Sequence, residues 1–485
     1  MIALTSLGDG ALAVLLGGPI VAALLVMVLP GHGISAGLNA LSSLLAFLAS
    51  VVLLYQRPQP GLLIQVDDLN VVMITLTTFI AFTSSLFSAG YIAHERRTGR
   101  LTRRTSRFYH AMYQSLMFAM SLALLANNIG LMWVAIELAT LTAVLMVGLY
   151  RSPAALEAAW KYFILGSVGV ALALFGTMLV YFAAAGAVGD GLDAMAWTVL
   201  VARAADFEPS LLNLAFIFLL LGYGTKMGLV PLHAWLPDAH AEGPTPITAV
   251  LSGLLINVSL YVVLRFKMVV AANPNVLPPG PLMIGLGLLS VAFATLMLYR
   301  RGDIKRLFAY SSIEHIGLAT FAFGMGGPLA NFAGLLHMVM HSLTKSAIFF
   351  AVGHIVQVKG TQRMSGIRGL GDSHPVLGWG LALGILAIAG LPPFGVFLSE
   401  FLLISATFGR APLLTLILIA GLLIALGALV LRLNDLVLGA AEGETRPCEG
   451  SVLPLVLHLL LVLAAGLWLP PPLVAWFQHV ATQLG

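Results

Sequence analysis

Six ionisable residues of this sequence lie inside stretches of apolar residues, where a charged side chain is expensive. A charge at the centre of a membrane helix costs about 2.5–3.5 kcal/mol on insertion scales, so each such residue needs a partner or a function. A buried carboxylate and a buried amine influence each other's protonation, because an opposite charge favours the charged form whereas desolvation favours the neutral form. This is the chemistry of a proton relay. The six candidates are Glu137, Lys226, His337, His341, Lys345 and Glu400.

Three of these candidates follow one another at helical spacing. His337, His341 and Lys345 stand four residues apart, which places them on one helix face at intervals of about 6 Å. A neutral imidazole donates from one ring nitrogen and accepts at the other, so the row can serve as a proton ladder. The structural alternative is helix packing through hydrogen bonds, with Lys345 paired to a backbone carbonyl. For Glu137 and Glu400, the alternative is a salt bridge that locks helices together.

The composition shows what kind of elements must position these residues. Only 9% of the 485 residues are charged, whereas 59% are hydrophobic and the mean hydropathy is +0.99. Ordinary soluble domains carry about 25% charged residues. The composition therefore excludes a soluble enzyme, a disordered scaffold and a nucleic-acid binder, and it indicates a membrane protein. The single cysteine, Cys448, excludes an intrachain disulfide and a cysteine-ligated iron–sulfur cluster, so we expect electron transfer in another subunit.

Apolar stretches suited to crossing a membrane occur fourteen times along the chain, a spanning helix needing about 20 residues. Short loops join them, and no soluble domain is inserted. The first residues lack the basic segment of a cleaved signal, so we expect the first span to remain as an anchor. The stretches are 11–30, 36–55, 69–91, 108–126, 129–150, 160–186, 211–230, 246–272, 280–299, 304–326, 330–357, 376–404, 411–433 and 451–470.

Basic residues are distributed unevenly between the loops. Numbered in chain order, the odd loops hold 17 of the 24 Lys and Arg residues, whereas the even loops hold five. Because positive charge accumulates in short cytoplasmic loops, we predict a bacterial cytoplasmic membrane protein with odd loops inside and both termini outside. The Arg-rich run at 94–107 is either a topogenic loop or a contact site for anionic lipid or protein. The five even-loop residues are Arg57, Arg203, Arg265, Lys267 and Arg410.

Two of the spans contain proline and glycine where the helix should continue. The first has Pro231 and Pro237 after Lys226, and the second has the run at 390–393 before Glu400. Proline removes a backbone hydrogen bond from a helix. Irregular backbone at membrane depth is tolerated only when it is buried in protein or lines a wet cavity. The sequence therefore predicts two broken helices, each beside a polar cavity.

The two breaks are five spans apart, which indicates two repeats of five helices. An odd number of spans per repeat makes the repeats inverted. We therefore predict an all-α polytopic membrane protein with about 14 transmembrane helices and one broken helix in each inverted repeat. The predicted segments are an N-terminal three-helix segment at 1–107, a first repeat at 108–272, a second repeat at 280–433 and a C-terminal helix at 434–485.

Long motifs at the two breaks and between them resemble a known family. They read GYGTKMGLVPLHAWLPDAHAEGPTPITAVLSGLLINVSLYVVLRF, RGDIKRLFAYSSIEHIGL and GLPPFGVFLSEFLL. They are similar to the antiporter-like membrane subunits shared by respiratory complex I, Mrp-type sodium/proton antiporters and membrane-bound group 4 nickel–iron hydrogenases. The resemblance covers roughly residues 70–435 and implies a proton path along the membrane plane. Carried over by motif, the path consists of Glu137, Lys226, His337, His341, Lys345 and Glu400.

Departures from the family pattern favour one branch. Asn257 stands where complex I subunits of this type usually have a lysine, which weakens a simple lysine-to-lysine relay. Glu314 precedes His315 in the motif SSIEHIG, which resembles the hydrogenase-4/formate hydrogenlyase branch. Glu314 then adds a protonatable group, or it pairs with a cytoplasmic-side Arg or Lys. His233 and His240, in the motif at the first break, complete the accessory candidates.

These observations predict a proton-translocating subunit of a multi-subunit membrane oxidoreductase of the group 4 hydrogenase or complex I type. We expect no cofactor, metal site or catalytic centre in this chain. The implied partners are further antiporter-like membrane subunits, peripheral redox subunits with metal centres, and the lipid bilayer, but no nucleic acid. Two alternatives stay open. One is an Mrp-type sodium/proton antiporter subunit, and the other is a membrane scaffold without transport.

Overall fold

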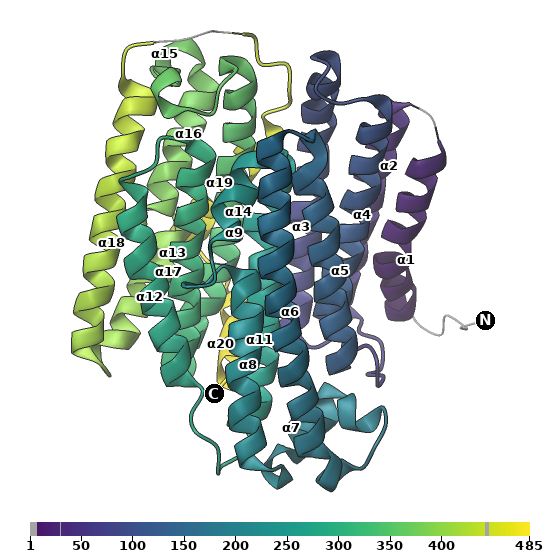
Figure 1. Cartoon of the computed structure of the whole chain (residues 1–485). Helices are drawn as coiled ribbons and strands as arrows, with labels where there is room; N and C mark the ends of the chain where they lie inside the picture. Colours follow the sequence, from purple (N-terminus) through teal and green to yellow (C-terminus); the bar gives the residue numbers. More distant parts are fainter. Residues whose placement is uncertain (1–6, 30, 442–445) are drawn as a thin grey trace. The chain divides into compact units, whose positions relative to one another are not determined.

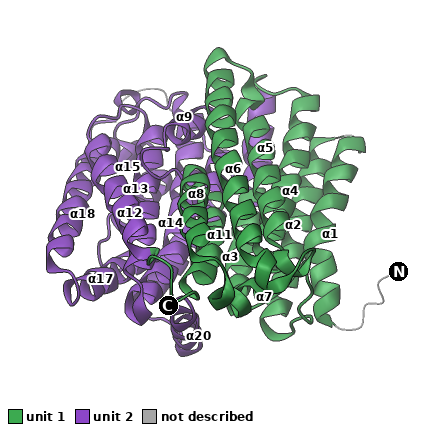
Figure 2. Ribbon diagram, turned by 60° about the horizontal axis from the view of Figure 1, so that its bottom comes forward, with its two compact units in different colours: residues 1–85, 98–227, 255–279 green, residues 86–97, 228–254, 280–485 purple. Residues whose placement is uncertain are grey.

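The computed structural model of the chain describes residues 7–29, 31–441 and 446–485, and in these ranges the regular elements are helices (Figure 1). Two compact units divide the chain (Figure 2). The first unit comprises residues 1–85, 98–227 and 255–279, and the second comprises 86–97, 228–254 and 280–485. The chain therefore changes unit at 85/86, 97/98, 227/228, 254/255 and 279/280, and the third of these positions is the first break.

The first unit is built from long helices. It contains α1 (Leu7–Val28), α2 (His32–Tyr55), most of α3 (Asp68–Arg97), α4 (Arg103–Leu125), α5 (Ile129–Val147), α6 (Pro153–Val188), α7 (Trp197–Arg203), α8 (Pro209–Met227) and α11 (Ile256–Ala271). A 3-10 turn, Gly148–Tyr150, follows α5 directly. Side chains that could do chemistry are presented by α5, α6 and α8.

The second unit combines long helices with short ones. It contains α9 (Trp235–Glu242), α10 (Thr245–Val250), α12 (Gly280–Leu298), α13 (Ile304–Met325), α14 (Gly327–Lys359), α15 (Leu370–Ser373), α16 (Pro375–Ile388), α17 (Gly395–Phe408), α18 (Pro412–Leu433), α19 (Leu453–Leu467) and α20 (Pro471–Gln483). A π-helical turn, Leu251–Leu255, joins α10 to α11. The central helix for the chemistry is α14, whose side chains are nearly all buried.

Within the described residues, ten helices are long and apolar enough to cross a membrane, and α19 with α20 forms a further pair bent by 80°. Helices α4 and α13 reach spanning length with 23 and 22 residues but are more polar. Helices α16 and α17 are shorter apolar helices of 14 residues each, and both lie in the predicted stretch 376–404 or at its edges. Each of the fourteen predicted stretches thus contains a helix or a broken helix, which confirms the all-α polytopic fold. The four-part division into repeats stays a prediction.

Both predicted breaks are present. Helix α8 ends at Met227, Gly228 adopts a φ of +78°, and α9 begins at Trp235. In the second break, α16 ends at Ile388, Gly390 adopts a φ of +67°, and α17 begins at Gly395. Glycine suits both positions because residues with a Cβ rarely adopt a positive φ. Lys226 and Glu400 therefore lie next to breaks of the helical backbone.

Close packing of α6 on α8 depends on small residues. A Cβ on Gly222 of α8 would lie 2.5 Å from the backbone nitrogen of Ala173 and 2.6 Å from the carbonyl oxygen of Gly169, both on α6. In the membrane, small residues let helix backbones approach closely, and packing contacts then replace the hydrophobic effect as the source of association. This approach brings the end of α8, with Lys226, against α6.

Two basic residues that were assigned to an even loop from sequence lie inside a helix instead. Arg265 and Lys267 are inside α11 and are buried. Arg265 forms an ion pair of 2.6 Å with Asp67, and its guanidinium stacks 4.3 Å from the ring centre of Trp197. Burial raises the pKa of Asp67, but the charge of Arg265 and a backbone N–H from Asn70 outweigh burial and hold that pKa below its usual range. Hydropathy did not identify this pairing because the counter-charge, Asp67, is distant in sequence and directly precedes α3.

Candidate functional site

The first cluster of ionisable groups lies in the first unit and joins α5 to α8. Glu137 is the ninth of the 19 residues of α5, and Lys226 is the penultimate residue of α8. The Nζ of Lys226 lies 3.6 Å from Oε2 of Glu137. The Lys226 side chain is 1% exposed and that of Glu137 is 22% exposed. The two predicted residues therefore form a buried or half-buried ion pair.

Helix α6 provides the space in which this pair lies. A Cβ on Gly166 would be 3.1 Å from the Lys226 Nζ and 3.3 Å from Cγ2 of Thr140 on α5. Tyr162, one turn earlier on α6, is fully buried, and its hydroxyl interacts electrostatically with Glu137. Sequence reasoning did not select Gly166 or Tyr162. The sequence feature that could have pointed to them is the glycine-rich face of 160–186. Such a face is also typical of ordinary helix packing in membranes.

The separation within the pair has a chemical consequence. Direct hydrogen bonds between charged nitrogen and oxygen are about 2.7–2.9 Å long, so 3.6 Å is ion-pair contact without a direct bond. Electrostatic attraction at this distance still favours the charged form of each group. A small rotation of either side chain would make or break a hydrogen bond. The pair can therefore store or release a proton with little movement of the backbone.

The second cluster lies in the second unit and centres on α14. The rings of His337 and His341 stack with centroids 6.4 Å apart and planes at 11°, as expected for residues on one helix face. Lys345, the third residue of the row, is fully buried and donates from Nζ to the carbonyl oxygen of Phe308 on α13, at 2.8 Å. The structure thus contains the carbonyl pairing that was the structural alternative for Lys345.

A histidine from another helix joins this row. The Nδ1 of His315, on α13, lies 3.1 Å from Nε2 of His337, and its ring centroid is 5.5 Å from that of His341. The other ring nitrogen of His337 lies 2.9 Å from the hydroxyl of Ser399 on α17. Three helices therefore contribute to one hydrogen-bonded cluster. His315 had only been an accessory candidate, and Ser399 had not been considered.

Glu400 closes the cluster from the side of the second break. Its Oε1 lies 3.9 Å from Nδ1 of His315. A Cβ on Gly390 would overlap Oε2 of the same carboxylate, so the glycine of the break makes room for Glu400. His315, His337 and Glu400 each offer one donor atom, and these atoms lie within 4.8 Å of one another. Two imidazoles and a carboxylate at this spacing can share a proton, and the same set has the composition of a zinc site.

Two accessory residues lie near Lys345. Glu314 is buried on α13 and interacts electrostatically with Lys345 and with Glu400. It therefore faces buried partners instead of the loop cations considered from sequence. His240, on α9, is also buried, interacts electrostatically with Lys345, and places Nδ1 2.9 Å from the carbonyl oxygen of Leu236. Both residues can exchange charge with the row on α14.

The remaining accessory candidates occupy other environments. His233 lies half-buried in the first break, where its ring packs edge-on at 4.6 Å from the ring centre of Phe293. Asn257 is buried near the start of α11 in the first unit, just after the π-helical turn. Such turns occur often at functional sites. The roles of both residues stay predictions.

Two basic residues counted only as topogenic hold α9 in place. The Nζ of Lys305 donates to the carbonyl oxygens of Ala241 and Gly243, at 2.8 and 2.6 Å. Arg306 forms an ion pair of 2.8 Å with Asp238. The carbonyls at the end of a helix lack intrahelical partners, and a cation there also interacts well with the helix dipole. The start of α13 therefore positions the short helix that carries His240.

Residues 126–427 match the family model described as NADH:quinone oxidoreductase/Mrp antiporter, TM. This match covers more than half of the chain and includes all residues of both clusters.

Known proteins resemble the chain over nearly its whole length. A protein described as a hydrogenase-4 component F homolog, from Methylacidiphilum infernorum (isolate V4), is 59% identical over 466 residues, which cover 96% of this chain and 98% of that protein. A chain of the archaeal membrane-bound sulfane sulfur reductase is 22% identical with a TM-score of 0.86, covering 98% of this chain and 97% of the other. A chain of the Mrp complex from Dietzia sp. DQ12-45-1b is 17% identical with a TM-score of 0.81, with the same two coverages. The two structural similarities show a shared fold.

Proposed function

This chain belongs to the NADH:quinone oxidoreductase/Mrp antiporter transmembrane family, and on that premise we propose that it translocates protons as an antiporter-like membrane subunit of an oxidoreductase complex. The observation that carries the proposal is the buried cluster of His315, His337 and Glu400, whose donor atoms lie within 4.8 Å of one another. Such an arrangement is expensive in a membrane unless the groups have a function. The resemblance to a hydrogenase-4 component F homolog supports a complex of the group 4 hydrogenase type.

In the proposed mechanism, the Glu137–Lys226 pair is the switch of the first unit. When Glu137 is charged and close, it stabilises the charged form of Lys226 at 3.6 Å. A change of charge in a neighbouring subunit that draws Glu137 away leaves the ammonium buried without its counter-charge. Lys226 then releases its proton, and return of Glu137 favours renewed protonation.

The histidine cluster is the proposed relay of the second unit. Lys345 holds a proton against the Phe308 carbonyl and exchanges it with the adjacent imidazoles. His315 passes the proton onward through one atom: its Nδ1 accepts the proton from Nε2 of His337 at 3.1 Å and then releases it to Oε1 of Glu400 at 3.9 Å. Two-nitrogen transfer suits His337, which as neutral imidazole can accept at Nδ1, beside the Ser399 hydroxyl, and donate from Nε2, beside His315. Glu400, at the break, is the last group of this relay.

The nature of the donor atoms favours protons over sodium as the transported ion. The cluster offers imidazole nitrogens of His315, His337 and His341 beside one carboxylate. Hard cations prefer shells made of oxygen ligands, as Ca²⁺ and Mg²⁺ do in proteins. The proposal assigns redox centres to peripheral partner subunits and places the chain in the bacterial cytoplasmic membrane.

Everted membrane vesicles test the choice of ion. With the assembled complex supplied in turn with formate, hydrogen and NADH, we expect one donor to acidify the vesicle interior in sodium-free buffer. We expect added NaCl to leave that pH gradient unchanged, since no sodium exchange is proposed. Collapse of the gradient on NaCl addition would favour the sodium/proton antiporter. An assembled complex that oxidises its donor without any acidification would favour the scaffold.

The orientation proposed from the basic residues can be tested with the natural cysteine. Cys448 is exposed and lies in the loop between α18 and α19, which the positive charges predict to be cytoplasmic. We expect a membrane-impermeant maleimide to label Cys448 only after cells are opened. Partial burial and Glu449 raise the pKa of the thiol, so labelling should be done at mildly alkaline pH. As a control, Asp190→Cys in a Cys448→Ser background should be labelled in intact cells. The reverse pattern would overturn the orientation.

A further inference from the structure

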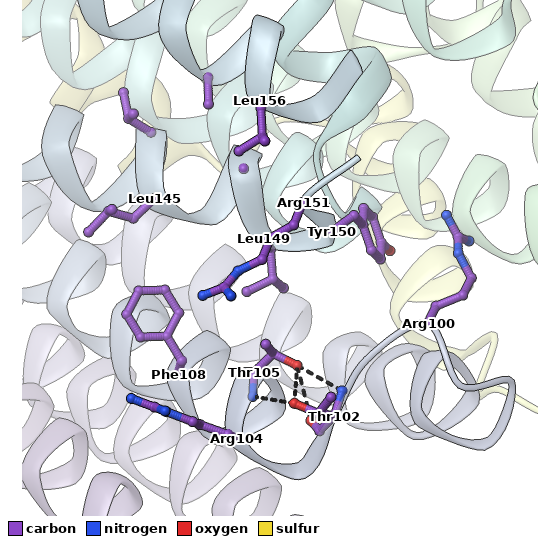
Figure 3. Close-up of a pocket in the computed structure, with 13 residues that line it drawn as sticks. Arg100, Thr102, Arg104, Thr105, Phe108, Leu145, Leu149, Tyr150, Arg151 and Leu156 are labelled. Carbon is purple, nitrogen blue, oxygen red and sulfur yellow. Dashed lines mark hydrogen bonds between the residues drawn. The ribbon is translucent and has the colours of Figure 1, made fainter. Parts of the chain in front are cut away.

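A cavity of about 750 Å³ lies in the first unit, where α4 and α6 begin and α5 ends (Figure 3). Its walls come from the loop between α3 and α4, the first turns of α4, the 3-10 turn after α5 and the start of α6. It is separate from the Glu137–Lys226 pair, whose residues are absent from its lining. Neither the proton relay nor the family match assigns it a role.

The polar part of the lining is positively charged. Arg100, Arg104 and Arg151 all line the cavity, and its lining contains no Asp or Glu. The guanidinium of Arg100 lies 4.5 Å above the ring of Tyr150. Figure 3 shows Arg104 and Arg151 on the other side of Tyr150, with Phe108 beside them. In the described part of the chain, the guanidinium groups of Arg104 and Arg151 have no ion pair or hydrogen bond.

The backbone at Arg151 holds this arginine at the wall of the cavity. Its φ is +56°, and in the described residues it is the one non-glycine residue with a positive φ. This conformation costs about 1–3 kcal/mol for a residue with a side chain, and such residues cluster at functional sites. Glycine would adopt the same conformation without strain. Arg151 ends the 3-10 turn in this conformation, with its N–H bonded to the carbonyl oxygen of Gly148, and this fixes where its side chain leaves the backbone at the cavity.

The two threonine hydroxyl groups of the lining are already engaged. Thr102 and Thr105 bond to each other's backbone N–H groups as a capping box at the start of α4, which Figure 3 shows as dashed lines. They hold the loop in shape and leave anion recognition to the arginines. A ligand of this cavity must therefore bring its own negative charge.

The rest of the lining is largely apolar, and part of it is exposed on the surface of the chain. Phe108, Val144 and Leu149 form part of the wall. Leu145 and Leu156, also in the lining, are 52% and 44% exposed, so an apolar chain could leave the cavity along them. A free inorganic anion would leave this apolar surface uncovered. A ligand with an anionic head and hydrocarbon tails would satisfy both parts.

We propose that this cavity binds the headgroup of an anionic phospholipid, with the phosphate at Arg104 and Arg151 and the acyl chains along Leu145 and Leu156. The lipid would join the beginning of α4, the end of α5 and the beginning of α6. Helix α5 carries Glu137, and α6 carries Gly166. Basic residues near a membrane surface attract anionic lipid by about 1 kcal/mol each, which is about fivefold in affinity. The Arg-rich run at 94–107 thus has a specific ligand as well as a topogenic role.

Thermal unfolding of the purified full-length chain in detergent tests the proposal. Dioleoylphosphatidylglycerol, dioleoylphosphatidylcholine and inorganic phosphate are added separately. We expect phosphatidylglycerol to raise the unfolding midpoint of the natural protein. The variant Arg104→Gln/Arg151→Gln should need about 25-fold more of that lipid for the same rise, at about fivefold per arginine. Phosphatidylcholine and phosphate should have little effect.

A matched control uses a neighbouring arginine. Arg103 is exposed on the same turn of α4 but does not line the cavity. Arg103→Gln removes one charge and should respond to lipid nearly as the natural protein does. Arg151→Gly removes the charge and the backbone strain together, so it should stay folded while losing about fivefold in lipid affinity.

Three results would overturn the proposal. An unchanged lipid response in Arg104→Gln/Arg151→Gln would make the Arg-rich run topogenic only. An equal response to inorganic phosphate would assign the site to a free anion. The third result concerns a cysteine placed at Leu156 in the assembled complex. If this cysteine stays protected from thiol labelling after complete delipidation, the surface belongs to a protein partner.

Discussion

Glu137→Gln is expected to reduce proton translocation by at least about tenfold, equivalent to about 1.4 kcal/mol in the barrier, while the complex still assembles. The amide keeps the shape of the side chain but removes the negative charge that lies 3.6 Å from the Lys226 Nζ. Lys226 is 1% exposed, so water cannot replace the lost counter-charge. Its charged form then loses the electrostatic stabilisation on which the cycle depends.

Donor-driven acidification of everted vesicles measures this effect, with the amount of assembled complex determined in the same membranes. A suitable control is Glu157→Gln, because Glu157 is also in the first unit and pairs with Lys161 at 2.6 Å, but both side chains are exposed. Exposed ion pairs contribute about 0–1 kcal/mol. Glu157→Gln should therefore translocate protons at the natural rate. If Glu137→Gln does the same, Glu137 is outside the path.

A second large effect is expected for His315→Phe, which should reduce proton translocation by at least about tenfold. The substitution keeps an aromatic ring against His337 and His341 but removes Nδ1, the nitrogen that faces both His337 and Glu400. His315→Gln retains hydrogen-bonding atoms and should lose less. Because His337 and Glu400 donor atoms lie within 4.8 Å, an intervening water could carry some residual flux.

His341→Phe discriminates between a ladder on one helix and a cluster of several helices. In a simple ladder, this change would interrupt the row between His337 and Lys345. In the structure, His315 contacts His337 directly and interacts electrostatically with Lys345, so it offers a route around His341, on which it also stacks. We therefore expect a smaller loss for His341→Phe than for His315→Phe. The opposite order would support the ladder.

The control for both phenylalanine variants is His458→Phe. His458 is buried in the same unit on α19, its Nδ1 lies 3.1 Å from the carbonyl oxygen of Leu343, and it is outside the cluster. Translocation by this variant should stay near the natural rate in assembled complex. An equal loss in His458→Phe and His315→Phe would indicate that added aromatic volume, and not the lost nitrogen, causes the defect.

Sequence alone determined the features that depend on local composition and periodicity. Apolar runs predicted the helices, proline and glycine predicted both breaks, and four-residue spacing placed His337 and His341 on one face. These features follow from the short-range geometry of the helix, in which each residue advances by a constant rise and rotation. Sequence reasoning also selected Glu137 and Lys226, because each is an ionisable residue at membrane depth that needs a partner or a function, and the structure pairs them at 3.6 Å.

Only the tertiary structure decided which side chains from different helices meet. His315 became the junction of the cluster, Lys345 found the Phe308 carbonyl, and Glu400 was fitted against Gly390. Arg265 lies inside α11 and pairs with Asp67, although the position of Arg265 in the sequence suggested the end of a loop. The register of one helix against another depends on how small and large residues interdigitate, which is a property of both surfaces together. A single sequence specifies each surface but does not reveal which two surfaces will pack.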